Sequence, residues 1–196
     1  YNGAAIVPEN PIIDNPDWLI DEEFVFVAGG FDAIPAVEEP NFELYRSKDY
    51  LSSDFHVAND DRITVVSIDG VIRGYPHNIL TRHEVVNDEI NGVKFSVTYC
   101  PLTATSYCWE RGNTSYGVSG LLYNNNLVLY DRESESLWSQ IMSLSVFGEK
   151  IGDKPIPIRC FETTFETFQN LYDFQAEVMT LETGYIFDYV GNPYVE

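Results

Sequence analysis

Short runs of β-branched and aromatic residues, separated by tight-turn dipeptides, recur along this chain and restrict its fold class. The clearest case is residues 63–68, followed by Asp69-Gly70 and then by residues 71–73. In such a hairpin the glycine supplies the positive φ that the turn requires. Asn91-Gly92 begins another turn, and the alternating segment 93–99 follows it. The pattern predicts antiparallel hairpins.

Other segments extend this prediction. We expect further strands at 24–27, 42–45, 105–110, 115–123 and 127–131, and residues 134–142 form a weaker candidate. One helix is predicted over 77–86, where Pro76 suits the first helical position, and another from Thr163, which matches a capping box with Glu166, through about 172. Many short strands with two short helices predict a mainly β domain with a barrel-like or sandwich-like antiparallel sheet, with α+β as the alternative.

The chain length of 196 residues fits one compact unit. We predict that residues 1–61 form an extended N-terminal arm and first strands packed on the domain, because their first part is rich in Pro, Asn and Asp. Residues 62–196 are predicted to form the core domain. We expect its aromatic segment 185–189 to pack back on the sheet.

The charge of the chain excludes some partners. With 31 acidic and 11 basic residues, its formal charge is −20, which repels nucleic acid and anionic lipid surfaces. Such a surface attracts cations, and a loosely bound calcium is compatible with it. However, clusters such as 21–23 and 59–61 lack the alternating ligands of an EF-hand loop, so we expect them to be solvated surface.

The sequence also suggests a location. No apolar run approaches the roughly 20 residues that span a bilayer. The chain begins at Tyr1 without an initiating Met or a basic-then-apolar leader, and we interpret it as the processed form of an exported protein, periplasmic, cell-surface or extracellular. A trimmed fragment of a longer chain would look the same. A protein partner or self-assembly at the cell surface fits such a location.

Three groups of motifs occur in a fixed order. They are Tyr75-Pro76 with 82–88 (RHEVVND), then 98–103 (TYCPLT), then 116–123 (YGVSGLLY) with 127–132 (LVLYDR) and 136–140 (SLWSQ). Over roughly residues 62–190 the chain resembles the domain-of-unknown-function family 3179. That resemblance implies a mostly exported or lipid-anchored bacterial or archaeal protein, from a family without a settled activity.

One motif departs from a common form of the family. Many members carry a second cysteine three positions after the first, whereas this chain has Thr103, giving TYCPLT rather than TYCPLC. The resemblance therefore implies a second branch of the family, in which this motif provides no dithiol for exchange. Cys100 and Cys108 bracket an expected hairpin turn, so a disulfide between them is an alternative, and Cys160 makes the number of cysteines odd.

His83 and Cys100 form the strongest candidate chemical pair. They lie 17 positions apart (100 − 83), on a short helix and on the strand that adjoins it. A thiolate beside an imidazole binds copper or zinc, or acts as a nucleophile with its base. In the alternative reading, Cys100 is a buried small hydrophobe and His83 a hydrogen-bonded loop cap.

A tetrahedral metal site would need further ligands, and the candidates are His77, Glu84, Asp88 and Met142. Glu84 and Asp88 equally suit the capping of a helix end. Elsewhere in the motifs, we expect Asp131 and Arg132 to pair and order a turn, and Trp138 to fill the core. Three functions remain open: an exported binding or structural module, a Cys/His metal protein and a cysteine-dependent enzyme.

Overall fold

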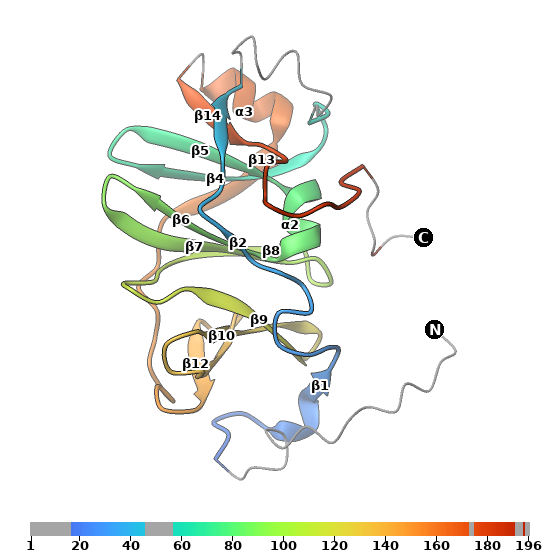
Figure 1. Ribbon diagram of the computed structural model, residues 1–196, viewed down its shortest axis with the longest axis vertical. Helices are drawn as coiled ribbons and strands as arrows, with labels where there is room; N and C mark the ends of the chain where they lie inside the picture. The colour runs from blue at the N-terminus through green and yellow to red at the C-terminus, as the bar shows by residue number, and fades with distance from the viewer. Residues whose placement is uncertain (1–16, 46–56, 173–174, 191–193, 195–196) are drawn as a thin grey trace.

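The computed structural model describes residues 17–45, 57–172, 175–190 and 194 (Figure 1). Strands make up 44% of the described residues, which also include two short α-helices. These features confirm the predicted mainly β domain with two short helices. Three mostly antiparallel sheets form within the described residues, and none of them closes on itself.

The three sheets follow one another along the long axis of the molecule, and we name them by their positions in Figure 1. The upper sheet has the order β13 (Cys160–Thr164), β4 (Arg62–Ile68), β5 (Val71–Pro76), β14 (Ala176–Met179) and β3 (Phe42–Leu44). The middle sheet has the order β2 (Val37–Glu38), β6 (Val85–Ile90), β7 (Val93–Cys100) and β8 (Thr105–Glu110). The lower sheet has the order β1 (Val25–Val27), β9 (Tyr116–Tyr123), β10 (Asn126–Asp131), β11 (Leu137–Ser139) and β12 (Leu144–Phe147).

Helices occupy the flank and one end of this stack. The 3₁₀ helix η1 (Glu22–Phe24) precedes β1, and α2 (His77–His83) connects β5 to β6. The helix α3 (Phe165–Leu171) follows β13, and its Phe165 and Phe168 cover Ile63 and Val65 on the outer face of the upper sheet. No helix among the described residues is long and apolar enough to span a bilayer.

The middle sheet is buried on both faces, which explains why β7 is apolar or buried along most of its length. Phe95 and Val97 face the core between the upper and middle sheets, here called the upper core. Cys100 faces the core between the middle and lower sheets, here called the lower core, together with Trp138 as expected. Because successive side chains of a strand point to opposite faces, the middle sheet contributes side chains to both cores.

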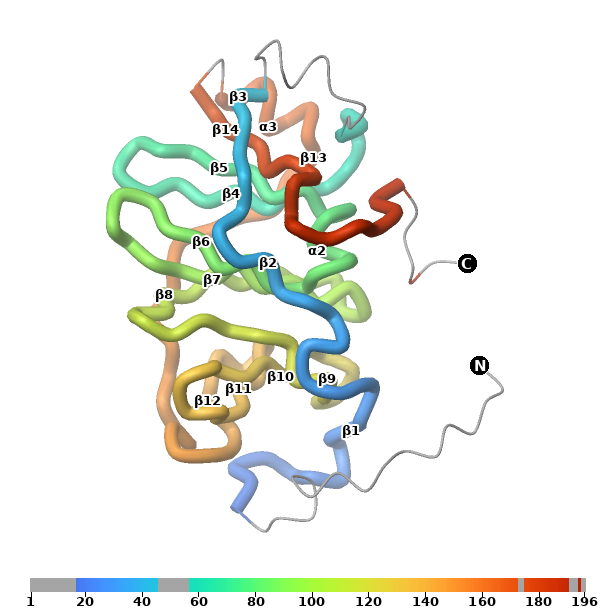
Figure 2. The backbone as a smooth tube through the Cα atoms, viewed as in Figure 1, coloured from blue at the N-terminus to red at the C-terminus, as the bar shows by residue number. Residues whose placement is uncertain are grey.

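The N-terminal segment links all three sheets. Strands β1, β2 and β3 lie in the lower, middle and upper sheets respectively, so residues 25–44 run along the whole stack, as the blue part of the tube in Figure 2 shows. Ahead of them, Trp18 and Ile20 pack on the lower sheet. Residues 1–16 of the predicted arm lie outside the described part of the chain.

The Asp-Gly hairpin and the strands after Asn91-Gly92 form as predicted, but the boundaries of both helices differ. The first helix ends at His83 instead of residue 86, and the chain enters β6, which the sequence analysis did not predict. The second helix has Thr164, not Thr163, as its N-cap, and the Thr164 hydroxyl accepts a hydrogen bond from the amide of Thr167. The predicted capping box is therefore wrong by one residue.

The aromatic C-terminal segment packs back on the domain as predicted, through Tyr189, which is buried in the upper core with residues of the upper and middle sheets. Tyr185, Phe187 and Tyr189 also lie around the ring of His83 at the end of α2. The side chain of Tyr189 is buried, whereas that of Ile186 is fully exposed. The segment therefore covers the end of α2 through alternate residues.

Candidate functional site

The end of α2 has a left-handed residue with a carboxyl side chain. Glu84 has φ 59° and ψ −26°, and its amide donates to the Leu80 carbonyl to close the helix. Its carbonyl accepts a 2.7 Å hydrogen bond from the amide of Tyr99, which starts the pairing of β6 with β7. A residue with a β-carbon costs on the order of 1 kcal/mol in this conformation. The two backbone hydrogen bonds that Glu84 makes at this junction offset that cost.

The Glu84 side chain lines a pocket at one edge of the lower core. The pocket has a volume of about 110 Å³, and its walls come from residues 28–30 and 33–34, from β9 and from Leu102. Apart from Glu84 and Tyr194, the lining side chains are apolar or absent; Val118, Leu121 and Leu127 are among them. A few convergent polar groups in an apolar concavity are typical of small-molecule sites.

The carboxyl group of Glu84 is nearly withdrawn from solvent, with 7% of the residue exposed. Burial raises its pKa to about 7, while the hydrogen bond from Tyr194 opposes that rise. The Tyr194 hydroxyl donates to Oε1 at 2.9 Å. Near neutral pH the carboxyl group is therefore divided between a form that accepts hydrogen bonds and a form that also donates one.

A close backbone approach shapes one wall of the pocket. The carbonyl of Gly120 accepts hydrogen bonds from the amides of Ala28 and Gly29, at 2.8 and 3.0 Å. Gly120 has φ 78°, and a β-carbon added there would lie 2.3 Å from the Gly29 carbonyl oxygen. Only glycine combines this conformation with this approach.

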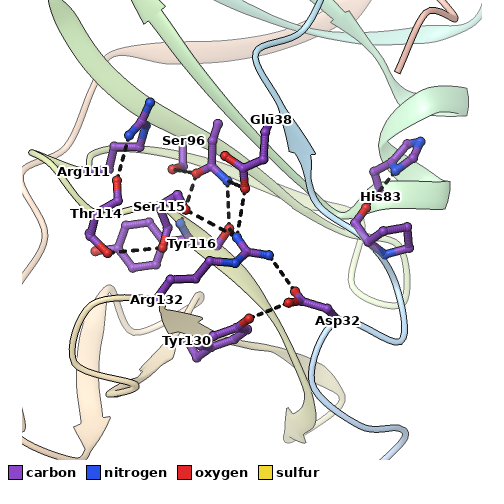
Figure 3. Close-up of polar contacts among 12 residues, drawn as sticks. Asp32, Glu38, His83, Ser96, Arg111, Thr114, Ser115, Tyr116, Tyr130 and Arg132 are labelled. Carbon is purple, nitrogen blue, oxygen red and sulfur yellow. Dashed lines mark hydrogen bonds and ion pairs between the residues drawn. The ribbon is translucent and has the colours of Figure 1, made fainter. Parts of the chain in front are cut away.

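In the structure His83 bonds to residues other than Cys100, the partner suggested by the sequence. Its Nδ1 donates to the Pro35 carbonyl at 2.8 Å, and its Nε2 accepts from the Tyr189 hydroxyl at 2.7 Å. The ring is fully buried, and this burial lowers its pKa. Figure 3 shows the His83 ring away from the polar network that centres on Arg132. Both nitrogens are occupied, as in a hydrogen-bonded loop cap.

Cys100 lies near the same end of the middle sheet, in the lower core. Its residue is 1% exposed, and its thiol donates to the Asn125 carbonyl at a sulfur–oxygen distance of 3.7 Å. Within the described residues no hydrogen bond joins Cys100 to His83. A nucleophile–base pair made of these two residues stays a prediction.

The further ligand candidates are dispersed. His77 contacts the Thr64 hydroxyl at 3.0 Å through Nε2, and burial lowers its pKa to about 4. Asp88 lies at the other end of β6, bound by Arg73 at 2.8 and 2.9 Å and by the Tyr75 hydroxyl at 2.6 Å. Across the described ranges no group of three or more His, Cys, Asp or Glu residues is placed to hold a metal ion. A copper or zinc site that would include Met142 or these residues stays a prediction.

The three cysteines are free thiols in this structure. Cys100 faces the lower core, whereas Cys108 faces the upper core, and their partners across the β7–β8 ladder are Thr105 and Val97 respectively. The suggested Cys100–Cys108 disulfide is therefore wrong, because the two side chains point to opposite faces of the sheet. Cys160 packs against the same core as Cys108.

Arg132 organises a polar network that the sequence analysis missed (Figure 3). Its guanidinium pairs with Asp32 at 2.9 Å and with Glu38 at 2.8 Å, not with Asp131. Asp131 instead accepts from the Trp138 indole at 3.0 Å and from Ser134. The predicted Asp131–Arg132 pair is wrong, because the partners of Arg132 come from the N-terminal segment about a hundred residues away.

Asn87 extends this network into the sheets. Its side-chain nitrogen donates to Glu38 at 2.9 Å and to the Tyr116 carbonyl at 2.8 Å, and its oxygen accepts from Ser96 and from the Tyr116 amide. The hydrogen-bonding groups of this network are paired with one another, so the network holds the N-terminal segment against the middle and lower sheets.

The fold and the pocket define a mainly β protein of three stacked sheets, with one buried carboxyl group facing an apolar concavity. The model of the family described as "Protein of unknown function (DUF3179)" matches residues 31–196, and the chain belongs to this family. The match begins upstream of residue 62, where the resemblance was predicted to start, and so includes strands β2 and β3. No curated protein matches the chain, and no solved structure does.

Proposed function

We propose that the protein is an exported binding module, at the cell surface or in the periplasm, that takes a small and mainly apolar ligand into the pocket beside Glu84. The observation that carries the proposal is the carboxyl group of Glu84, buried at the end of α2 and lining an otherwise apolar pocket of about 110 Å³. Among the described residues no ion pair involves the Glu84 carboxyl group, so its burial is expensive and a ligand donor would offset that cost.

The dimensions of the pocket limit the ligand. An apolar cavity of about 150 Å³ holds benzene, so this pocket suits a group of roughly four to six non-hydrogen atoms. The ligand would place a hydrogen-bond donor, or an amine, at the carboxyl group and aliphatic atoms against Val118, Leu121 and Leu127. Binding without catalysis fits the surroundings of His83 and Cys100, whose polar atoms bond to groups of the protein itself.

The location rests on different support. The formal charge of −20 suits a protein that stays soluble where salt screens its charges, and the resemblance of the motifs to the family implies export. Fractionation of the source cells, with antibody detection, tests this part. Recovery in the cytosolic fraction alone would rule it out.

Ligand binding is testable with isobutylamine as a cationic probe and isobutanol as a neutral one. The shifts of the Val118, Leu121 and Leu127 methyl groups would be followed by ¹³C-methyl NMR at pH 7.5. For probes of about five non-hydrogen atoms, dissociation constants in the millimolar range are expected. The Glu84→Gln variant should weaken isobutylamine binding by about tenfold and change isobutanol binding by less than roughly threefold.

A matched control is Glu39→Gln, because Glu39 also has a positive φ, of 52°, but is exposed. This variant should bind both probes like the parent protein. If neither probe moves the three sets of methyl signals at concentrations up to roughly 100 mM, the pocket does not bind ligands of this class and the proposal fails.

A further inference from the structure

The chain that enters β13 runs first along the free edge of β8. The amide of Glu110 donates to the Ile156 carbonyl and the amide of Ile158 to the Cys108 carbonyl, both at 2.8 Å. A bridge between Trp109 and Pro157 lies between these bonds. Two residues later, at Cys160, the chain begins its pairing with β4 in the upper sheet. Cys160 therefore stands where the chain passes from the middle to the upper sheet.

This path brings two thiols together that lie 52 residues apart in the sequence (160 − 108). Cys108 is buried in the upper core, and Cys160 packs against the same core but is partly exposed. Cys108 bonds through its backbone carbonyl to the amide of Ile158, and Cys160, two residues further on, packs against the core that contains Cys108. Cys100 faces the lower core and has no part in this contact.

The thiols of Cys108 and Cys160 differ in pKa. The neighbouring Cys108 lowers the pKa of Cys160 in spite of its partial burial. Burial raises the pKa of Cys108, and the neighbouring Cys160 adds to that rise. An accessible, more acidic thiol beside a buried one is the usual arrangement of an attacking and a resolving cysteine.

We infer that Cys108 and Cys160 form a redox-active dithiol whose oxidation closes a disulfide between the middle and upper sheets. The oxidant is a disulfide donor, either a small molecule or another protein. The Cys160 thiolate attacks one sulfur of the donor, breaks its disulfide bond and expels one donor thiolate. The Cys108 thiol then loses its proton to solvent and attacks the Cys160 sulfur, which expels the second donor thiolate. Two protein thiols are oxidised, and one donor disulfide is reduced to two thiols.

This pair is separate from the Cys100 motif and from the pocket beside Glu84. It also provides a dithiol where the 98–103 motif, with Thr103 three positions after Cys100, has none. The disulfide would join the edge strand of the middle sheet to the edge strand of the upper sheet. A cross-link of this kind would hold the two layers together at their edge.

The experiment oxidises the folded full chain with glutathione disulfide at pH 8, blocks the remaining thiols with iodoacetamide under denaturing conditions, and maps peptides without reduction. We expect one intramolecular disulfide, Cys108–Cys160, with Cys100 recovered as the alkylated thiol. Three alkylated cysteines after prolonged oxidation, or a bridge that includes Cys100, would overturn the inference. This measurement needs no variant.

Two variants then assign the roles of the cysteines. In Cys108→Ser the attack can start but not finish, so Cys160 should accumulate as the mixed disulfide with glutathione. In Cys160→Ser no adduct should form on the folded protein, because Cys108 and Cys100 are both buried. Equal glutathione labelling of Cys108 in the Cys160→Ser variant would contradict the assigned order of attack. The Cys100→Ser variant serves as the control and should oxidise like the parent protein.

Discussion

The Tyr194 hydroxyl donates a 2.9 Å hydrogen bond to the carboxyl group of Glu84, and the two residues bring the polar groups to a pocket that is otherwise apolar. The residues are 110 positions apart in the sequence. Glu84 is held by the end of α2, whereas Tyr194 reaches the pocket from the C-terminal part of the chain. The pair therefore depends on the tertiary fold, and its hydrogen bond moderates the rise in the pKa of Glu84 that burial causes.

The first prediction concerns stability against pH. The pKa of Glu84 is about 7 in the folded protein, whereas the ordinary value for glutamate is 4.5. Between these two pH values the folded state binds more protons than the unfolded state, so this residue makes stability fall as pH rises, and the loss is complete above the folded pKa. A shift of this size corresponds to roughly 3 kcal/mol.

Glu84→Gln should remove this contribution. Urea unfolding of the parent protein and the variant between pH 4.5 and 8 gives the difference in unfolding free energy, which should move in favour of the variant as the pH increases. Glu39→Gln, on the surface, should leave the pH profile of the parent unchanged. Parallel profiles for the parent and Glu84→Gln would mean that the carboxyl group titrates normally.

The second prediction isolates the hydroxyl of Tyr194. Because its hydrogen bond lowers the pKa of Glu84, Tyr194→Phe should raise that pKa above its present value of about 7. The carboxyl carbon of Glu84 can be followed directly by ¹³C NMR during a pH titration. Tyr185→Phe is the matched control, since this tyrosine belongs to the same C-terminal region and packs on His83. A lower pKa in Tyr194→Phe would show that the hydrogen bond does not favour the ionised form.

The third prediction tests the backbone approach at the pocket wall. Gly120→Ala adds a β-carbon 2.3 Å from the Gly29 carbonyl oxygen at a residue with φ 78°. We expect a loss of roughly 2–4 kcal/mol in unfolding free energy, from backbone strain and steric overlap together. Gly92→Ala separates the two causes, because Gly92 has φ 84° but nothing within 4 Å of the added carbon. Gly92→Ala should lose only about 1–2 kcal/mol of unfolding free energy. Equal losses in both variants would show that steric overlap contributes little.

The sequence predicts the hairpins well because their signals are local. Asp69-Gly70 and the flanking β-branched residues specify the β4–β5 turn without reference to the rest of the chain. Strand β6 was missed for the opposite reason. It is buried on both faces, so it lacks the polar–apolar alternation of a half-buried strand, and Asn87 and Asp88 are unfavourable strand residues.

Those two residues are compatible with a strand only through distant partners. Asn87 bonds across the middle and lower sheets, and Asp88 is bound by Arg73 and Tyr75 of the upper sheet. The recognisable motif at 82–88 is therefore largely a set of buried polar contacts. The partners of Arg132 and the proximity of Cys108 to Cys160 in the upper core likewise arise from long-range packing, which spacing in the sequence does not encode.

The last prediction separates a structural Cys100 from a metal-binding one. Its thiol packs in the lower core against side chains such as Val85 and donates to the Asn125 carbonyl. Cys100→Ala removes one buried atom and its weak hydrogen bond, so we expect a loss of about 1 kcal/mol in unfolding free energy. Elemental analysis of the natively purified parent and variant should give the same copper and zinc content. Stoichiometric metal that disappears in the variant would instead establish Cys100 as a ligand, and the binding-module proposal would then have to give way to a metal protein.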